Sequence, residues 1–342
     1  MGYHLGVTQT KTIKRRQFIM GTNHPCENAN GTPFGTYFNP AGYMNVYGTR
    51  AGKMSMEYEG NFMETESYVA IFESTYEAIA KWLPAPLEPD RDIPPFVMFV
   101  YWDTDCAGFA DGRRNQYRGC ALLPACKYVG EDGTIVKGNL CAVEYVDGID
   151  GDKTAGAEMI LAMGGNKGCN KKLGNIVAKK WGDSFKFTCE RRGTVLVDAE
   201  FTSCKPVKPQ MASEAKVADA KAQAVLNMMA RDTLGLREVP NVDHRGYTAR
   251  SIVKLGSTYH PDNKIFYMAA GGTCNIKFGH LETDPVDLFA PEGVSVGGVT
   301  HVIKDNPKTS WLGCEEVVKL PLTGPGIDEP APDDPAYEDY KK

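Results

Sequence analysis

Short segments rich in β-branched and aromatic residues follow one another along most of this chain, and this succession constrains the fold more than any other feature. The segments are PFVMFVYW (95–102), GCALLPACKYVG (119–130), TIVKGNLCAVEYV (134–146), SFKFTCERR (184–192), TVLVDAEFTSC (194–204), TARSIVKL (248–255), KIFYMAAG (264–271) and TCNIKFGH (273–280). Such composition favours pleated strands. Because helical segments do not alternate with these strands, a parallel βαβ arrangement is disfavoured. The sequence therefore predicts an α+β domain built on a mainly antiparallel sheet.

Turns and helices complete this prediction. Gly130–Gly133 and Arg191–Gly193 are short, glycine-containing connections that are typical of hairpins. Ser74–Leu83 has apolar residues at helical spacing, and Ser74 followed by Glu77 has the pattern of a capping box. Met211–Leu234 carries an Ala, Leu and Met face opposite a charged face. We expect both helices to pack against the outside of the sheet.

The chain divides into three parts by composition. Residues 1–60 are rich in Gly, Asn, Tyr and Thr and are expected to form an irregular N-terminal extension. Residues 61–321 hold the strand and helix patterns and form the predicted domain. Residues 322–342 form an acidic, proline-rich tail with too little apolar surface to order itself.

Charge and hydropathy exclude several classes of protein. The 342 residues contain 38 Lys and Arg against 43 Asp and Glu, and the isoelectric point is near 5.8. A nucleic-acid-binding protein would normally show a basic surplus. No segment reaches the roughly 18 apolar residues of a membrane span, and the N-terminus lacks the apolar region of a secretory leader. We expect a cytoplasmic protein that binds neither nucleic acid nor membrane.

The ten cysteines are unevenly spaced and mostly lie inside apolar, strand-like segments. No Cys-x-x-Cys pair occurs, and no histidine lies at zinc-ligand spacing from two cysteines. Buried free thiols are the favoured interpretation, and neither a metal nor a cofactor is expected. The four tryptophans are expected in the core.

The most reactive pattern is a pair of adjacent lysines, Lys171 and Lys172, within Asn170-Lys-Lys-Leu-Gly174 after a glycine-rich loop. Adjacent lysines usually lie on a solvated surface, and spacing alone favours that interpretation. The alternative is a nucleophilic amine that attacks a carbonyl group. Such an amine must be neutral, whereas an ordinary lysine has a pKa of about 10.4. Apolar burial and a neighbouring positive charge both favour the neutral form.

Several stretches resemble the acetoacetate decarboxylase family in the order expected for it, over roughly residues 65–303. They are YVAIFESTYEAIAKWLPAPLEPD, PFVMFVYWDT, PACKYVGEDG, AVEYVDGID, AGAEMI followed by KKLGNI, LGLREVPNVDHRGYTARSIVKL and GHLETDPVDLFAP. No single motif is decisive, but their collinearity is. The resemblance implies a curved, cone- or barrel-like sheet with external helices. It also implies a homo-oligomer.

The resemblance further implies roles for individual residues. Lys171 matches the family's Schiff-base nucleophile, and Lys172 matches the neighbour whose charge lowers the pKa of that nucleophile. Glu158 matches the glutamate of the family's Gly-Arg-Glu segment and is a candidate for proton transfer. Gln116 and Arg118 lie where the family has a glutamate, and they are candidates for binding the substrate.

The chain also departs from the family pattern at polar positions. Asn170 replaces the proline before the lysine pair, and Ala157 replaces the arginine of Gly-Arg-Glu. Thr65 stands where decarboxylating members carry an arginine that holds the substrate carboxylate, and Val97 stands at a position that is often acidic. These positions define how a β-keto acid is held, so decarboxylation of a simple β-keto acid is less favoured than for a typical member.

The sequence thus predicts a carbon–carbon lyase that forms a Schiff base with a keto acid or related small carbonyl compound. Decarboxylation, aldol-type and dehydration chemistry all fit, and a role in secondary metabolism fits such divergence. The alternative is a non-catalytic binding protein that kept the pocket of the fold. A third interpretation is that the lysines are merely exposed. Burial separates these cases, because an active Lys171 should be enclosed and an inert pair should face solvent.

Overall fold

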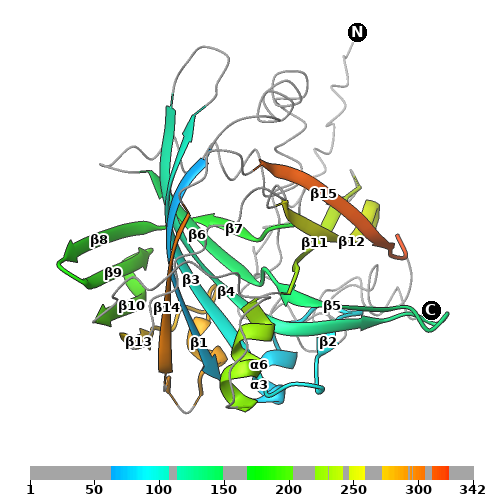
Figure 1. Ribbon diagram of the computed structural model, residues 1–342. Helices are drawn as coiled ribbons and strands as arrows, with labels where there is room; N and C mark the ends of the chain where they lie inside the picture. The colour runs from blue at the N-terminus through cyan, green and yellow to red at the C-terminus, as the bar shows by residue number, and fades with distance from the viewer. Residues whose placement is uncertain are drawn as a thin grey trace, which may run out of the picture.

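The computed structural model describes residues 63–107, 114–148, 168–202, 220–229, 231–241, 246–258, 272–291, 293–294, 296–304 and 310–322 (Figure 1). The predicted N-terminal extension and acidic tail lie almost wholly outside the described residues, as do Glu158 and the expected strand at 264–271. The division of the chain into three parts therefore stays a prediction.

Strands make up most of the described chain. They are β1 Met63–Glu73, β2 Glu88–Pro89, β3 Phe96–Ala107, β4 Arg114–Val129, β5 Ile135–Leu140, β6 Val143–Gly148, β7 Lys171–Leu173, β8 Asn175–Trp181, β9 Ser184–Arg191, β10 Thr194–Thr202, β11 Thr233–Pro240, β12 Tyr247–Thr258, β13 Gly272–Phe278, β14 Val296–Lys304 and β15 Ser310–Lys319. The helices are α3 Tyr76–Ala80, α6 Ala220–Met229 and the 3-10 helix η5 Val286–Phe289.

The strands form one sheet whose main path runs β15-β12-β11-β5-β4-β3-β1-β14-β13-β10-β9-β8. β2, β6 and β7 branch from this path, and among the described strands only the β5–β11 and β6–β7 pairs are parallel. Figure 1 shows the path turning from β15, β12 and β11 on one side of the molecule to β8, β9 and β10 on the other. The predicted fold class, a curved and mainly antiparallel sheet, is confirmed. Among the described strands β15 and β8 do not pair with each other, so the sheet is not a closed barrel there.

Both predicted hairpins are present. β4 and β5 pair antiparallel across Gly130–Gly133, and β9 and β10 pair antiparallel across Arg191–Gly193. In the second turn Arg192 and Gly193 adopt φ values of 51° and 80°, as required for a turn that follows the twist of its strands. Local turn chemistry was sufficient to predict these connections.

The helices are shorter than predicted. α3 is capped by Thr75, whose Oγ1 accepts a hydrogen bond from the Ala78 amide at 3.0 Å, while the Ser74 hydroxyl donates to the Phe289 carbonyl. The predicted cap at Ser74 was therefore wrong by one residue, because a distant segment binds that hydroxyl. The second helix ends at Met229, and Leu234 belongs to β11, where it is fully buried. Burial in the sheet outweighed the helical pattern at that end.

The core is rich in aromatic side chains, which come mainly from β1, β3, β9, β10 and η5. Tyr68 stacks on Phe185 with ring centroids 4.1 Å apart, and Trp82 stacks on Phe289 at 4.2 Å. Six cysteines whose side chains the structure describes, at 120, 126, 141, 169, 189 and 274, are free and buried, which confirms the interpretation as core thiols for these six. The expectation for the tryptophans was wrong at Trp181, which is 48% exposed at the end of β8.

Among the described residues, no helix combines the length and the apolar composition needed to cross a bilayer. The cytoplasmic location and the homo-oligomer stay predictions.

Candidate active site

The strand that carries the two lysines is fixed to β6 by main-chain and side-chain hydrogen bonds. The Glu144 amide donates to the Asn170 carbonyl at 3.0 Å, and Asn170 Nδ2 donates to the Ala142 carbonyl at 3.0 Å. At the other end, the Gly174 amide donates to the Val146 carbonyl at 3.1 Å. These bonds set a parallel register in which Glu144 pairs with Lys171 and Tyr145 pairs with Lys172.

Gly168 allows the chain to enter this strand. Its φ of +68° is a conformation that favours glycine, and a Cβ there would lie 2.4 Å from the carbonyl carbon of Leu236 in β11. The backbone thus passes directly against β11 before reaching Cys169. A side chain at residue 168 would move β7 away from its place beside β6.

The two lysines project to opposite faces of the sheet, because successive residues of a strand alternate. Lys171 lies on the face of Glu144, and Lys172 lies on the face of Tyr145. In the β4–β6 register Arg118 pairs with Asp147, which lies two residues after Tyr145 in β6 and therefore on the same face. Arg118 is thus on the face of Lys172. Adjacent lysines in the sequence therefore occupy separate environments.

The face of Lys171 is enclosed. The Lys171 amine donates a short hydrogen bond to Glu144 Oε1, and the two side chains are only 3% and 6% exposed. The Lys171 nitrogen also lies 5.8 Å from the centroid of the Trp102 ring and 6.0 Å from that of Tyr117. The amine is thus bounded by one carboxylate and two aromatic rings.

Gly119 makes room for one of these rings. It is the cross-strand partner of Trp102, and a Cβ on it would lie 2.3 Å from Trp102 Cζ2. The indole therefore lies across the bare backbone of β4 and reaches Lys171. This contact links a glycine in one strand to the environment of an amine two strands away.

The charges around Lys171 change its acidity in a direction that the sequence did not predict. Burial alone would lower the pKa of Lys171, but the Glu144 carboxylate, the Cys169 sulfur and the hydrogen bond to Glu144 together raise it above its ordinary value. The expectation of a lowered pKa is therefore wrong for the protein without substrate. The reasons are the ion pair with Glu144 and the projection of Lys172 to the opposite face.

Two thiols complete this environment. Cys141 Sγ donates to Glu144 Oε2 at 3.4 Å, and its hydrogen bond with Cys169, together with burial, raises the pKa of Cys141 well above its usual range. The possible metal-ligating atoms of Cys141, Glu144 and Cys169 all lie within 4.8 Å of one another. The Lys171 cation already balances the charge of the Glu144 carboxylate. Hydrogen bonds among Cys141, Glu144 and Cys169 account for the close approach of these three side chains.

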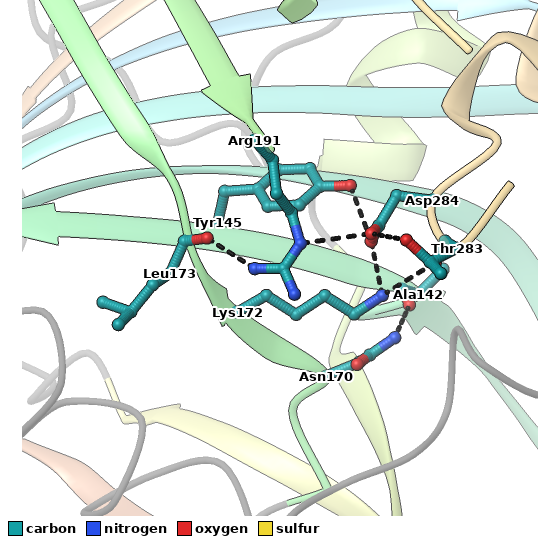
Figure 2. Close-up of polar contacts among 8 residues, drawn as sticks. All are labelled: Ala142, Tyr145, Asn170, Lys172, Leu173, Arg191, Thr283 and Asp284. Carbon is teal, nitrogen blue, oxygen red and sulfur yellow. Dashed lines mark hydrogen bonds and ion pairs between the residues drawn. The ribbon is translucent and has the colours of Figure 1, made fainter. Parts of the chain in front are cut away.

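The face of Lys172 is a charge network centred on a buried carboxylate, Asp284. Figure 2 shows Lys172, Arg191 and Tyr145 converging on it. Lys172 Nζ lies 2.5 Å from Asp284 Oδ1, Arg191 Nε lies 3.2 Å from Oδ2, and the Tyr145 hydroxyl donates to Oδ1 at 3.1 Å. The Thr283 hydroxyl donates to Oδ2 at 3.0 Å. Asp284 is completely buried and joins β7 and β9 to the segment before η5.

The pKa of Lys172 moves in the opposite direction to that of Lys171. Burial lowers the pKa of Lys172, and the neighbouring positive charges of Arg191 and Arg192 contribute to this, although Asp284 opposes them. The lysine with the depressed pKa is thus Lys172. Its amine nevertheless remains held by Asp284.

Of the other predicted site residues, Arg118 lies apart from Lys171. Arg118 lies on the face of Lys172 and forms an ion pair with Asp103, whose Oδ1 is 3.5 Å from Arg118 Nε. Gln116 lies in β4 opposite Asp105, but its side chain is outside the described part of the structure. Glu158 also lies outside the described residues. The proposed roles of Gln116 and Glu158 stay predictions.

Sequence reasoning missed the partners of both lysines. Glu144 interrupts an apolar run, Ala142–Val146, and a single carboxylate within such a run is a signal for a buried, paired acid. Trp102 was expected only as a core residue. Asp284 offered no comparable signal, because the segment Glu282–Pro285 has the composition of an ordinary surface turn.

Solved structures confirm the fold. Acetoacetate decarboxylase from Legionella pneumophila subsp. pneumophila strain Philadelphia 1 aligns with a TM-score of 0.53 and 17% identity, covering 76% of this chain and 87% of that one. An acetoacetate decarboxylase-like enzyme from Sphingomonas wittichii RW1 aligns with a TM-score of 0.53 and 16% identity, covering 77% of this chain and 94% of that one. No curated protein sequence matches the chain.

At the level of sequence, residues 46–309 match the family model described as acetoacetate decarboxylase (ADC). This match spans β1 through β14 and includes both lysines of β7. The collinear motifs and the curved antiparallel sheet agree with it. The chain belongs to the acetoacetate decarboxylase family.

Proposed function

We propose that this protein is a Schiff-base-forming enzyme that acts on a small carbonyl compound, with Lys171 as the nucleophile. The observation that carries the proposal is the enclosure of the Lys171 amine by a single carboxylate, Glu144, and the rings of Trp102 and Tyr117. Membership in the acetoacetate decarboxylase family supports the same class of chemistry. We further propose decarboxylase, aldolase or dehydratase-type reactions, in a setting such as secondary metabolism.

The position of Glu144 supports a role in preparing the amine. A protonated lysine cannot attack a carbonyl, so a nearby base must accept one proton. Glu144 Oε1 already binds the Lys171 amine, and Lys171 is its one cationic partner within the described residues. A carboxylate with a single cation can exchange a proton with it, after which both groups are neutral and burial no longer penalises their charges.

The same carboxylate suits the intermediate that follows. An iminium ion carries the positive charge of the original ammonium, and it needs a counter-ion when water is excluded. Glu144 lies where that charge would form. The Trp102 and Tyr117 rings offer their faces to the same cation, which adds a favourable electrostatic contact.

Reductive trapping tests the proposal. The purified protein is incubated with a panel of aldehydes, ketones and keto acids and sodium cyanoborohydride, and the modified residue is identified by tandem mass spectrometry of peptides covering residues 169–180. We expect a reduced adduct on Lys171. An adduct on Lys172 alone would assign the chemistry to the opposite face of β7.

One observation favours a second candidate, a binding protein without chemistry. Glu144 forms a buried ion pair with the Lys171 amine and raises its pKa, which favours the ammonium form. A permanent ion pair would bind a carbonyl compound only by hydrogen bonding. Absence of any lysine adduct, together with measurable binding of the same compounds by calorimetry, would favour this candidate.

A further inference from the structure

We infer that the Lys171 site selects uncharged carbonyl compounds over keto acids. This inference rests on the proposed function and deepens it by naming the class of substrate. It follows from the balance of charge around the amine, the position of Arg118 and the nature of the surrounding side chains. Each of these is independent of the family resemblance, which by itself favours keto acids.

The balance of charge is the first argument. Lys171 and Glu144 are 3% and 6% exposed, and they neutralise each other. An iminium ion formed from an uncharged ketone keeps this balance, with one positive and one negative charge. A keto acid would add a second carboxylate beside Glu144, and a buried charge without a partner is strongly disfavoured.

The second argument concerns the cation that a keto acid would need. Arg118 was the candidate for binding a substrate carboxylate, but the β4–β6–β7 register places it on the face of Lys172, and it is paired with Asp103. The other cations of that face, Lys172 and Arg191, share Asp284. Within the described residues, no second cation lies in ion-pair distance of Glu144.

The third argument is the apolar character of the surroundings. Trp102 and Tyr117 face the amine, and Val253 and Leu255 of β12 pack with Cys141 and Cys169 in one buried cluster. Such surfaces favour planar or apolar groups and offer a carboxylate no replacement for its hydration. Selectivity thus follows from both the absence of a partner charge in this part of the structure and the cost of dehydration.

The covalent step balances with these groups alone. Glu144 accepts one proton from the Lys171 ammonium, and the amine nitrogen attacks the carbonyl carbon, so that the C=O π electrons move to oxygen. That oxygen takes two protons in turn, one from nitrogen and one returned by Glu144, and leaves as water. An ammonium ion and a ketone have then become an iminium ion and one water molecule, with Glu144 again anionic.

A matched pair of probes tests the inference. Phenylacetone and phenylpyruvate share one skeleton and differ in a methyl group against a carboxylate. The rate of cyanoborohydride-trapped adduct formation on Lys171 is measured for each and divided by its rate with Nα-acetyllysine, which corrects for intrinsic reactivity. We expect the corrected rate to be at least tenfold higher for phenylacetone.

The outcomes separate this inference from the function on which it rests. Adducts on Lys171 with an equal or higher corrected rate for phenylpyruvate would overturn the selectivity and leave the Schiff-base function standing. Failure of both probes and of the wider panel to modify Lys171 would overturn the proposed function and the selectivity together. Unmodified wild-type protein suffices for these decisions, so they do not depend on whether a variant folds.

Two variants test whether the charge of Glu144 causes the selectivity. Glu144→Gln removes the negative charge, and in protein shown to be folded by circular dichroism it should reduce the preference to less than threefold. Glu144→Asp keeps the charge and should keep the preference. An unchanged preference in folded Glu144→Gln protein would show that the charge of Glu144 is not the cause.

Discussion

The two faces of β7 give adjacent lysines opposite electrostatic environments. On one face, Glu144 has Lys171 as its cationic partner, and two aromatic rings and two thiols surround the pair. On the other face, Asp284 is bound at once by Lys172, Arg191, Tyr145 and Thr283 (Figure 2). Among the described residues, Glu144 thus pairs with one cation, Lys171, whereas Asp284 pairs with two, Lys172 and Arg191.

We propose that this difference separates a reactive arrangement from a structural one. Asp284 forms ion pairs with Lys172 of β7 and Arg191 of β9, so it is suited to joining these strands to the segment before η5. A carboxylate with one cation can accept a proton and leave a neutral amine. The two adjacent lysines therefore lie in different chemical environments, and each face of β7 can be tested separately.

The largest expected difference between the faces concerns trapping. Lys171→Ala should abolish the cyanoborohydride-dependent adduct, because no other described amine lies at Glu144. Lys172→Ala should retain the adduct on Lys171, with a rate reduced by less than tenfold, because Lys172 projects to the other face. Peptide mass spectrometry of both variants checks this. Loss of the adduct in folded Lys172→Ala protein would contradict the separation of the faces.

The two carboxylates should differ next in their effect on stability. Glu144→Gln leaves Lys171 buried without an anion and should cost about 3–5 kcal/mol in the free energy of unfolding at pH 7. Asp284→Asn should cost less, about 1–3 kcal/mol, because the Lys172 and Arg191 side chains are 10% and 22% exposed and keep some hydration. Urea unfolding monitored by circular dichroism provides the measurement. A larger loss for Asp284→Asn would reverse this ranking.

A smaller effect is expected at the contact that places Trp102 on the face of Lys171. Gly119→Ala puts a methyl group 2.3 Å from Trp102 Cζ2 and should cost about 1–3 kcal/mol of stability by overpacking. Trapping on Lys171 should slow as the indole moves.

A double-mutant cycle provides the control for this contact. Trp102→Phe removes the clashing atom, so adding it to Gly119→Ala should recover part of the lost stability. If the two substitutions are strictly additive in thermal unfolding, the ring and the glycine are not coupled.

The smallest expected effect is a pair of opposite pH dependences. The raised pKa of Lys171 means that its contribution to stability is complete below the unfolded-state value of 10.5 and is lost as pH rises through the higher folded-state pKa. The lowered pKa of Lys172 has the reverse sign, so stability increases as pH rises from its folded-state pKa toward 10.5. Each slope is limited to about 1.4 kcal/mol per pH unit.

Single variants should separate these slopes. Between pH 8 and 11, Lys171→Met should make the pH dependence of unfolding free energy less negative than in the wild type, and Lys172→Met should make it less positive. Comparison with the wild type removes the contribution of other titrating groups. Slopes that change in the same direction would show that the two faces do not differ as described.

Local sequence patterns predicted much of the fold. The Gly130–Gly133 and Arg191–Gly193 turns and their flanking strands are where the residue types required them. The errors occurred where distant segments intervened. Ser74 lost its capping role to a hydrogen bond with Phe289, 215 residues away, and Leu234 joined a strand because burial there outweighed helical periodicity.

The candidate site was predicted only in part for the same reason. The importance of Lys171 followed from motif order, but its place in strand β7 and its carboxylate partner did not. Glu144 is a single acid within an apolar run, and this pattern indicates a buried, paired carboxylate. The sequence around Asp284 has the composition of a surface turn and gave no indication that this carboxylate is buried. Trp102 could be placed beside Lys171 only once the register of β3 and β4 was known.

The sequence by itself determined the strand-rich architecture, its principal turns, the family and the presence of two adjacent lysines. Once residues 171–173 are known to form strand β7, alternation along the strand separates those lysines onto two faces. Only the tertiary structure decided what each face contains. Lys171 meets a carboxylate 27 residues away and Lys172 meets one 112 residues away. The physical reason is that charge and burial act through space, and the register between distant strands sets both.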